Sequence, residues 1–152
     1  MEIRKIEISD RRSLVKLVSM MIGDSNIEEV ANSIVDDFYG NKLFSTFIAE
    51  SNKEIQGYVA YKRESFEGAN KVGEIVFLGV EECFRKQGCG RELATYVEEY
   101  AKNEGIRKLY VKTSPSNKRA VCFWIKQEYQ FEARLKDFSI DDHDAYFMGK
   151  RI

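Results

Sequence analysis

A basic, glycine-rich loop behind an apolar run is the strongest chemical signal in this sequence. The run Glu74–Val80 (EIVFLGV) leads to Arg85–Gly90 (RKQGCG), and from Leu93 apolar residues recur at helical spacing as far as Gly105, which is placed to end a helix. A strand, a glycine loop and a helix N-terminus direct unpaired backbone N–H groups at one spot, where the helix dipole favours an anion. The stretch therefore predicts a site for a phosphorylated ligand.

The spacing within the loop separates the known kinds of phosphate-binding loop. A Rossmann loop would need a third glycine where Leu93 stands, and a P-loop would need a lysine directly after its glycine. The loop instead reads R-x-x-G-x-G, and a second motif, Asn117–Lys126 (NKRAVCFWIK), follows later in the chain. Together the two motifs resemble the GCN5-related N-acetyltransferases (the GNAT family), which transfer an acetyl group from acetyl-CoA to an amine. Taken alone, the loop also fits a glycine-bearing surface turn.

The resemblance implies that acetyl-CoA is the co-substrate, and it assigns residues to it. These are Leu78, Gly79, Val80, Arg85, Lys86, Gln87, Gly88, Cys89, Gly90, Asn117 and Lys126. Gly79 would let the pantetheine arm approach the strand backbone closely, with tight packing of the strand as the alternative. Cys89 lies among the N–H groups of the loop, where the pKa of a thiol can be lowered, although a small filler residue is the simpler interpretation.

Glu74 is the candidate catalytic residue. An ammonium group with a pKa of about 10.4 is almost fully charged at neutral pH, so the acceptor must lose a proton before it can attack. Strand alternation places Glu74 on the same side as Val76, Leu78 and Val80. The histone-acetylating branch of the family has its glutamate base in a nearly identical E-I-V-F context. We therefore expect Glu74 to accept the proton, directly or through water, with an exposed strand-edge glutamate as the alternative.

Trp124 marks a departure from the family pattern. The common general acid of the family is a tyrosine at the position where this sequence has Trp124. An indole N–H donates a hydrogen bond but is no practical source of a proton. Tyr129 or Tyr146 could replace it, or the thiolate could leave against water. Phe123 and Trp124 also fit a pair of core aromatic residues at helical spacing.

Composition limits the remaining classes of function. The 152 residues carry 24 Lys and Arg against 25 Asp and Glu, a net charge of −1, which gives no support to a nucleic-acid-binding protein. No apolar run approaches membrane-spanning length, and the N-terminus shows no signal region. Three cysteines without metal-ligand spacing and the single His143, in an acidic turn, predict no metal site and a reduced cytoplasmic protein.

The order of apolar patterns predicts one domain over residues 1–152 in the α/β class. We expect strands near 2–6, 43–50, 55–62, 74–80, 108–113, 131–138 and 145–152, with a turn at 139–144. Helices are expected after a cap at Ser9 or Asp10, with Leu14, Leu17, Val18 and Met21 on its apolar face, and near 27–38, 93–104 and 117–127. The family resemblance, which spans the chain, implies a mixed, mostly antiparallel sheet flanked by helices, with a splayed cleft for acetyl-CoA.

The acceptor and the activity leave alternatives open. The acidic residues Asp24, Glu28, Glu29, Asp36 and Asp37 could attract a cationic amine, such as a polyamine, an aminoglycoside or a protein lysine, or could form an ordinary solvated helix face. The leading hypothesis is direct acetyl transfer to a primary amine, with a homodimer possible. Trp124 keeps open a non-catalytic acetyl-CoA-binding regulatory module. A phosphate-ligand-binding protein without CoA specificity is the third hypothesis.

Overall fold

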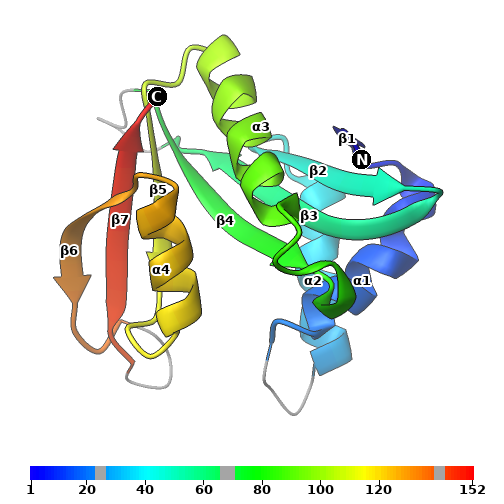
Figure 1. Cartoon of the computed structure of the whole chain (residues 1–152), viewed down its shortest axis with the longest axis horizontal. Helices are drawn as coiled ribbons and strands as arrows, with labels where there is room; N and C mark the ends of the chain where they lie inside the picture. Colours follow the sequence, from blue (N-terminus) through cyan, green and yellow to red (C-terminus); the bar gives the residue numbers. More distant parts are fainter. Residues whose placement is uncertain (23–26, 66–70, 139–142) are drawn as a thin grey trace.

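The structure is a computed structural model that describes residues 1–22, 27–65, 71–138 and 143–152. These residues form a seven-stranded sheet in the order β1-β2-β3-β4-β5-β7-β6 (Figure 1). The strands are β1 (Glu2–Lys5), β2 (Phe44–Ser51), β3 (Glu54–Arg63), β4 (Val72–Val80), β5 (Lys108–Thr113), β6 (Gln130–Leu135) and β7 (Ala145–Arg151). Strands β4 and β5 run parallel, and the other neighbouring pairs are antiparallel. The predicted mixed, mostly antiparallel sheet is confirmed.

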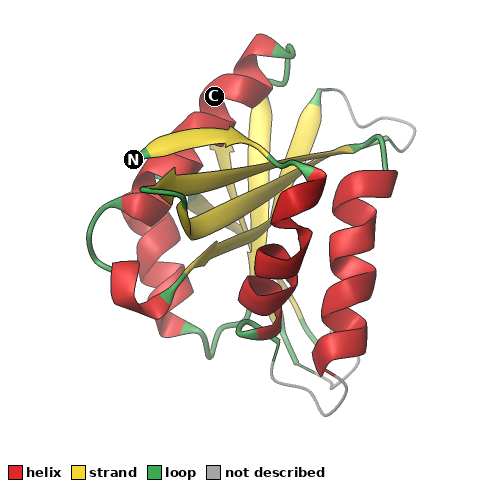
Figure 2. Cartoon of the chain, turned by 90° about the vertical axis from the view of Figure 1, so that its right-hand side faces the viewer, coloured by secondary structure: helices red, strands yellow, loops and turns green. Residues whose placement is uncertain are grey.

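Helices cover both faces of this sheet (Figure 2). They are α1 (Arg11–Ser19), α2 (Ile27–Gly40), α3 (Cys89–Asn103) and α4 (Lys118–Lys126), with short 3-10 turns η1 (Ile8–Asp10) and η2 (Glu82–Phe84). Helices α1 and α2 share one apolar layer with the sheet, and α3 and α4 share the other. Within the described residues, no helix combines the length and the apolar character that crossing a bilayer requires.

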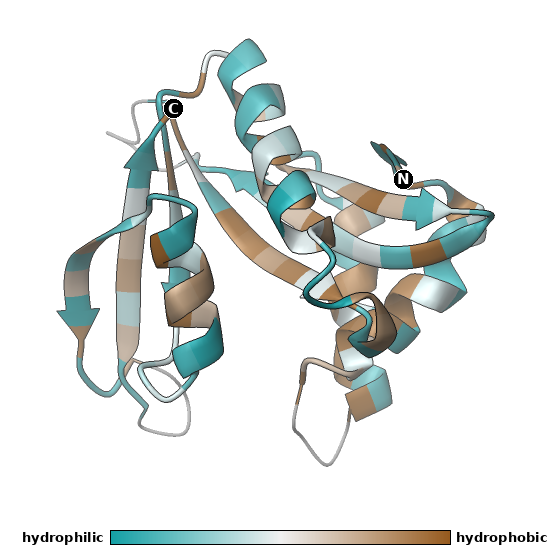
Figure 3. Cartoon of the chain, viewed as in Figure 1, coloured by the Kyte–Doolittle hydropathy of each residue, from teal (hydrophilic) through white to brown (hydrophobic). Residues whose placement is uncertain are grey.

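The two apolar layers follow from the alternation of side chains along the central strands. Tyr61 packs against Leu93 and the rest of the α3 layer, whereas its neighbours Tyr58 and Ala60 face the layer of α1 and α2, which includes Leu14. Strand β4 lies between these layers and is apolar along most of its length (Figure 3). Because both faces of the central strands are covered, their sequences read as continuous apolar runs rather than as alternating ones.

Most predicted elements are confirmed, with shifted ends. Strand β5 has the predicted bounds, and Gly105 follows α3 with a φ of +80°, as expected of a helix-ending glycine. Helix α1 ends at Ser19, so Met21 lies beyond it. Strand β6 ends at Leu135 rather than at residue 138. The turn predicted at 139–144 falls mainly outside the described residues.

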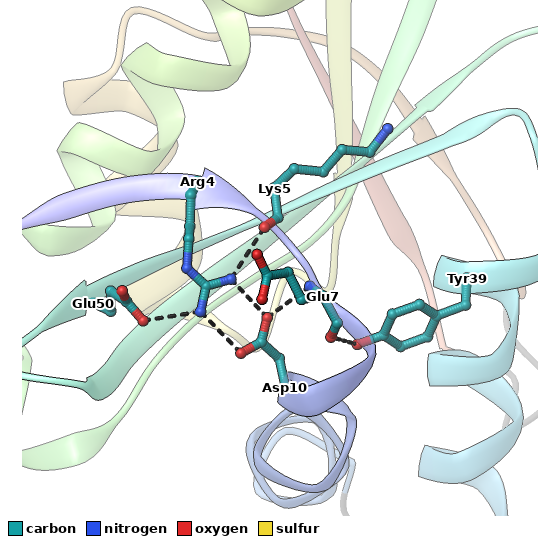
Figure 4. A network of polar contacts seen from close by, with 6 residues as sticks. All are labelled: Arg4, Lys5, Glu7, Asp10, Tyr39 and Glu50. Carbon is teal, nitrogen blue, oxygen red and sulfur yellow. Dashed lines mark hydrogen bonds and ion pairs between the residues drawn. The ribbon is translucent and has the colours of Figure 1, made fainter.

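The prediction of a side-chain cap for the first helix is wrong. Asp10 does precede α1, but its carboxylate makes no capping bond to that helix. It accepts hydrogen bonds from the backbone N–H of Glu7 at 2.7 Å and from the Arg4 guanidinium at 2.8 and 3.0 Å (Figure 4). Arg4 also contacts Glu50 at 3.0 Å, and the Tyr39 hydroxyl donates to the Glu7 carbonyl at 2.7 Å. This network joins β1 and β2 to the start of α1 and to α2.

Candidate active site

The parallel strands β4 and β5 separate partway along their length. They are paired at Val72 with Lys108, at Gly73 with Leu109 and at Glu74 with Tyr110, and not beyond. Past that point β4 continues to Val80 and β5 to Thr113, and Figure 1 shows the two strands diverging. No described strand pairs with this edge of β4 beyond Glu74, so its backbone groups, apart from the Val80 carbonyl, are available to a ligand. Glu74 stands at the last paired position.

A bulge in β4 sets the direction of Glu74, and it contradicts the predicted alternation. Tyr61 of β3 pairs with Ile75 and Ala60 pairs with Phe77, so Val76 is an extra residue. Ile75 faces the α3 layer, and so do Leu78 and Val80 beyond the bulge. Glu74 therefore faces the opposite side, that of α1 and α2. The expectation that Glu74 shares a face with Leu78 and Val80 is wrong, because one added residue reverses the phase.

The Glu74 carboxylate is buried, with 5% of the residue exposed, yet it has two polar partners. The Lys112 ammonium lies 3.0 Å from Oε1, and the Tyr110 hydroxyl donates to Oε2 at 3.2 Å. Both partners come from β5, where they alternate with residues of the α3 layer and so share the face of Glu74. The alternative of a solvent-exposed strand-edge glutamate is therefore excluded.

The Tyr110 hydroxyl is shared between two carboxylates. It donates to Glu64 through a short hydrogen bond as well as to Glu74. A phenol carries a single proton, so it cannot serve both acceptors fully, and the Glu74 oxygen receives the longer contact. Burial, followed by the hydrogen bond to Glu64 and the charge of Glu74, raises the pKa of Tyr110 well above its ordinary value. Tyr110 thus stays a donor at neutral pH and links buried Glu74 to the more accessible Glu64.

The loop before α3 has the geometry of an anion cradle. Lys86 and Gly88 both have positive φ values, 63° and 93°, and Gly88 directly precedes the helix. The first intrahelical bond runs from the Glu92 N–H to the Gly88 carbonyl, so the preceding N–H groups have no partner within the helix. Two side chains hold the loop in shape: Arg85 Nε donates to the Val80 carbonyl at 3.0 Å, and Gln87 Nε2 donates to the Cys83 carbonyl at 2.8 Å.

Gly90 connects this cradle to the strand divergence. A Cβ atom at Gly90 would lie 3.4 Å from Phe123, 3.5 Å from Val80 and 3.6 Å from Leu78, which are ordinary contacts. The first turn of α3 thus packs against side chains of the unpaired part of β4 and against α4. A phosphorylated ligand seated on the loop can extend from there along β4, so the residues present suit acetyl-CoA.

Of the two explanations expected for Gly79, the structure supports tight packing of the strand. The Glu81 N–H donates to the Gln56 carbonyl across the β3–β4 pair, so by alternation the backbone groups of Gly79 point toward β3. Those of Leu78 and Val80 point toward the free edge. A Cβ atom at Gly79 would lie 2.6 Å from both Met21 and Tyr58. Tight packing therefore accounts for the glycine at this position, and a contact of its backbone with acetyl-CoA stays a prediction.

Cys89 is a packing residue. It is 3% exposed, and its Sγ atom lies beside Gly57 of β3. Burial, together with the nearby charge of Glu92, raises the pKa of the Cys89 thiol to about 11. The possible lowering of this pKa by the loop is thus contradicted, because the side chain points into the core. All three cysteines are unpaired in the structure.

The two residues predicted from the second motif are placed at opposite ends of α4. Asn117 precedes the helix, and its side-chain oxygen accepts from the Ala120 N–H at 3.1 Å, which is a helix cap. Its amide NH₂ remains a donor. Lys126 is the last residue of α4 and is exposed. For both residues, a role in binding acetyl-CoA stays a prediction.

Trp124 belongs to the core rather than to an open site. It is 7% exposed and packs edge-on against Phe123 and Tyr129, with ring centroids 4.9 Å apart in each case. Tyr129 is 2% exposed, and burial raises its pKa well above the ordinary value, which makes it a poor proton donor. Tyr146 is partly buried and contacts Phe131. The identity of the general acid stays open between Tyr146 and water.

The acidic residues expected to attract the acceptor lie on an exposed helix face. Glu28, Glu29, Asp36 and Asp37 are all exposed on α2, and Asp24 falls outside the described residues. Asp36 is already paired with Arg11 at 2.6 Å. This arrangement favours the solvated-face interpretation.

Three residues that contact Glu74, directly or through one hydroxyl, were not singled out from sequence: Tyr110, Lys112 and Glu64. Alternation along Lys108–Thr113 places Tyr110 and Lys112 on one face, so the pattern was present. Pairing them with Glu74 requires the β4–β5 register and the bulge, neither of which has a sequence signature. Glu64 lies near them because it directly follows β3 and stands two residues after Lys62, which pairs with Glu74.

Comparisons with known proteins agree with this geometry. Residues 18–129 match the model of the acetyltransferase (GNAT) family. N-alpha-acetyltransferase 30 of Schizosaccharomyces pombe is 25% identical over 101 residues, 66% of this chain and 67% of that protein. The ribosomal-protein-alanine N-acetyltransferase of Brucella melitensis has a TM-score of 0.85 at 20% identity, with all of both chains covered. The NatC complex bound to Gag peptide and CoA contains a chain with a TM-score of 0.80 at 19% identity, covering 100% of this chain and 99% of that one.

Proposed function

Because the chain belongs to the GNAT acetyltransferase family, whose co-substrate is acetyl-CoA, we propose that it acetylates a primary amine by direct transfer, with Glu74 as the base. The observation that carries the proposal is the position of Glu74. It is a buried carboxylate at the last residue pair before β4 and β5 separate, with lone pairs left for a further donor. A buried carboxylate that has polar partners but can still accept a further hydrogen bond fits proton transfer better than it fits a structural role.

The bulge gives the two substrates separate approaches. The loop, Gly90 and the side chains of Leu78 and Val80 lie on the α3 side of the sheet, whereas Glu74 faces the side of α1 and α2. The donor can therefore lie along the free edge of β4 while an amine reaches Glu74 from the other face. This arrangement supports a ternary complex, in which the amine attacks the thioester without an enzyme-bound acetyl intermediate.

The proton removed from the amine has a route away from the reaction. Glu74 accepts it, and the shared Tyr110 hydroxyl connects Glu74 to Glu64, which is less buried. Passing the proton along this chain returns Glu74 to its charged form for the next acceptor. Acetyl-CoA supplies the activated acetyl group, and the residues of the chain orient the amine and manage its proton.

The acceptor class is proposed from the relatives. Two of them are named for the acetylation of protein α-amines, and the third holds a peptide. A peptide α-amine, with a pKa near 8, is also easier to deprotonate than a lysine. We place an N-terminal peptide amine first, ahead of a polyamine, an aminoglycoside or a protein lysine.

A panel of amines tests this function. CoA release is measured with an N-terminal peptide, the same peptide with a blocked α-amine and an internal lysine, spermidine and an aminoglycoside. We expect turnover with the free α-amine and less with the others. Binding of acetyl-CoA without release of CoA from any amine would favour the regulatory module instead, and equal affinity for ATP would favour an unspecific phosphate site.

Gly90 provides the matched control for the site. Gly90→Ala adds one methyl group at ordinary contact distances and should bind acetyl-CoA normally. Gly90→Asp places a negative charge between Phe123, Val80 and the loop, and its affinity should fall at least about tenfold, or about 1.4 kcal/mol. Unchanged affinity in a folded Asp variant would place the cofactor elsewhere. A cytoplasmic location and a homodimer stay predictions.

A further inference from the structure

A lysine of the chain itself holds an ammonium group at the candidate base. Lys112 Nζ lies 3.0 Å from Glu74 Oε1, the distance at which an acceptor ammonium would give up its proton. The base therefore has a primary amine beside it before any acceptor arrives. A salt bridge between a buried acid and a lysine is an ordinary structural device, so the surroundings of Lys112 must show whether it is also placed to react.

The position of Lys112 along β5 is the second observation. The pairing of β4 with β5 ends at Glu74 and Tyr110, and Lys112 lies two residues further, on the part of β5 that has left β4. Its side chain thus stands beside the strand divergence, where the acetyl end of the donor is proposed to arrive. The ammonium also lies 5.8 Å from the centre of the Phe138 ring, so it is held from two sides. The side chain is nevertheless 36% exposed.

We propose that Lys112 occupies the acceptor-amine position and is acetylated by its own chain. The proposal rests on the proposed function, since it uses the same base and the same donor. Nζ of Lys112 loses a proton to Glu74, attacks the thioester carbonyl carbon and forms a C–N bond. The C–S bond breaks, and the CoA thiolate takes the second proton of the amine. Acetyl-CoA and the lysine ammonium thus yield an amide, CoA and one proton on Glu74.

The modification has a consequence for Glu74. Acetyl-lysine carries no charge, so the ion pair with Glu74 is lost and the carboxylate becomes available to an external ammonium. In the unmodified chain, Lys112 competes with that ammonium for the same oxygen. Self-acetylation would therefore act as a priming step that lowers the KM for a cationic acceptor.

Lys108 is a matched internal control. It lies on the same strand and the same face as Lys112, and it pairs with the Glu132 carboxylate at 2.7 Å. The exposed fractions of the two side chains are similar, 27% and 36%. Lys108, however, stands about 13 Å from Lys112 along the strand, where β4 and β5 are still paired. Chemical acetylation should not favour Lys112 strongly over Lys108, whereas transfer within the site should.

The test follows acetyl incorporation by peptide mass spectrometry in the purified full chain. Samples receive acetyl-CoA, or acetyl phosphate as a donor that needs no enzyme, at several protein concentrations. With acetyl-CoA we expect Lys112 to react at least about tenfold faster than Lys108, because only Lys112 is held beside the base. The rate per molecule should not depend on protein concentration, and it should fall at least about a hundredfold in Glu74→Gln. Acetyl phosphate should show no such preference.

Two further variants keep the outcome clear. Lys112→Arg retains a cation beside Glu74 but should remove this acetylation, whereas Lys108→Arg should leave both acetylation of Lys112 and turnover unchanged. Lys112 left unmodified in a sample that acetylates an external amine would overturn the proposal and leave the proposed function intact. A sample that acetylates neither would overturn both. Acetylation of Lys112 that persists in Glu74→Gln, or whose rate per molecule rises with protein concentration, would also overturn transfer within one chain.

Discussion

Asp10 and Glu74 are the two buried carboxylates in the described part of the chain, 6% and 5% exposed, and their surroundings differ. Asp10 accepts hydrogen bonds from both terminal nitrogens of Arg4 and from the backbone N–H of Glu7 (Figure 4). These bonds, chiefly the one from Arg4, lower the pKa of Asp10. Glu74 has one lysine and a share of one phenol. Burial alone therefore does not distinguish the candidate catalytic acid from a structural one in this molecule.

The difference lies in what each partner can release. A guanidinium binds a carboxylate through two fixed hydrogen bonds and does not give up its proton, so the Asp10 carboxylate stays paired with Arg4. A lysine ammonium is flexible and can lose a proton, and a tyrosine shared with Glu64 can pass one on. The Asp10 network ties strands to helices, whereas the Glu74 network stands where two strands separate. Neutralising Glu74 should accordingly lower the activity, whereas neutralising Asp10 should lower the stability.

The largest expected effect is on catalysis at Glu74. Glu74→Gln keeps the shape of the side chain but cannot accept a proton, so kcat/KM at neutral pH should fall by about 10² to 10⁴. Acetyl-CoA binding should survive, because the loop is a separate site. Raising the pH should restore part of the rate, since more of the acceptor then arrives deprotonated. Asp10→Asn, assayed well below its melting temperature, should retain its activity. A pH–rate curve of Glu74→Gln that overlays the parent's would remove Glu74 from the mechanism.

The second effect is on stability, and it has the opposite pattern. Asp10→Asn leaves the partly buried Arg4 without its main partner, so the free energy of unfolding should fall by about 2 to 4 kcal/mol, below the cost for a wholly buried pair. Glu74→Gln should lose less than about 1 kcal/mol, because Lys112 can turn to water. Urea unfolding at neutral pH measures both. Equal losses of unfolding free energy in the two variants would contradict the distinction between Asp10, which is paired with a guanidinium, and Glu74, which is open to a further donor.

The dependence of stability on pH sharpens the same prediction. The pKa of Asp10 is lower in the folded chain than in the unfolded one, because Arg4 stabilises its charged form. Its contribution is therefore fully present above the unfolded pKa of about 3.9 and is lost as the pH falls through the lower folded value. Acidification from about pH 5 to pH 2 should destabilise the parent more than Asp10→Asn, and the two stabilities should converge.

A smaller effect is expected at Tyr110. Tyr110→Phe removes the hydroxyl between Glu64 and Glu74 while keeping the ring that stacks on Phe147. The loss of a hydrogen bond to a charged group should lower kcat/KM by about 10- to 100-fold, less than the loss of the base itself. Tyr100→Phe is the matched control, because the hydroxyl of Tyr100, on α3, also donates to a glutamate, Glu104, which directly follows that helix. Equal kinetics in the two variants would argue against a proton route through Tyr110.

The sequence predicted the sheet and the loop better than it predicted the site. Strand alternation and glycine spacing are local, so β5, the loop before α3 and the end of α3 shortly before Gly105 could be predicted directly. The direction of Glu74 depends on a single extra residue opposite Tyr61, which only strand pairing reveals. The partners of Glu74 depend on where β4 and β5 separate. Local pattern thus locates the acid, and long-range register decides what surrounds it.

The smallest effect is expected at Trp124, the residue that departs from the family pattern. Trp124 is packed between Phe123 and Tyr129, and no described residue accepts a hydrogen bond from its indole. If it serves only packing, Trp124→Phe should lose about 1 kcal/mol of stability, part of the cost of a core truncation, and keep most of its turnover. Trp124→Tyr restores the usual hydroxyl of the family and should be tolerated. Thermal unfolding and kcat at saturating acetyl-CoA measure the two quantities separately. A loss of more than about a hundredfold in kcat for the Phe variant, with acetyl-CoA binding preserved, would make the indole N–H part of the chemistry.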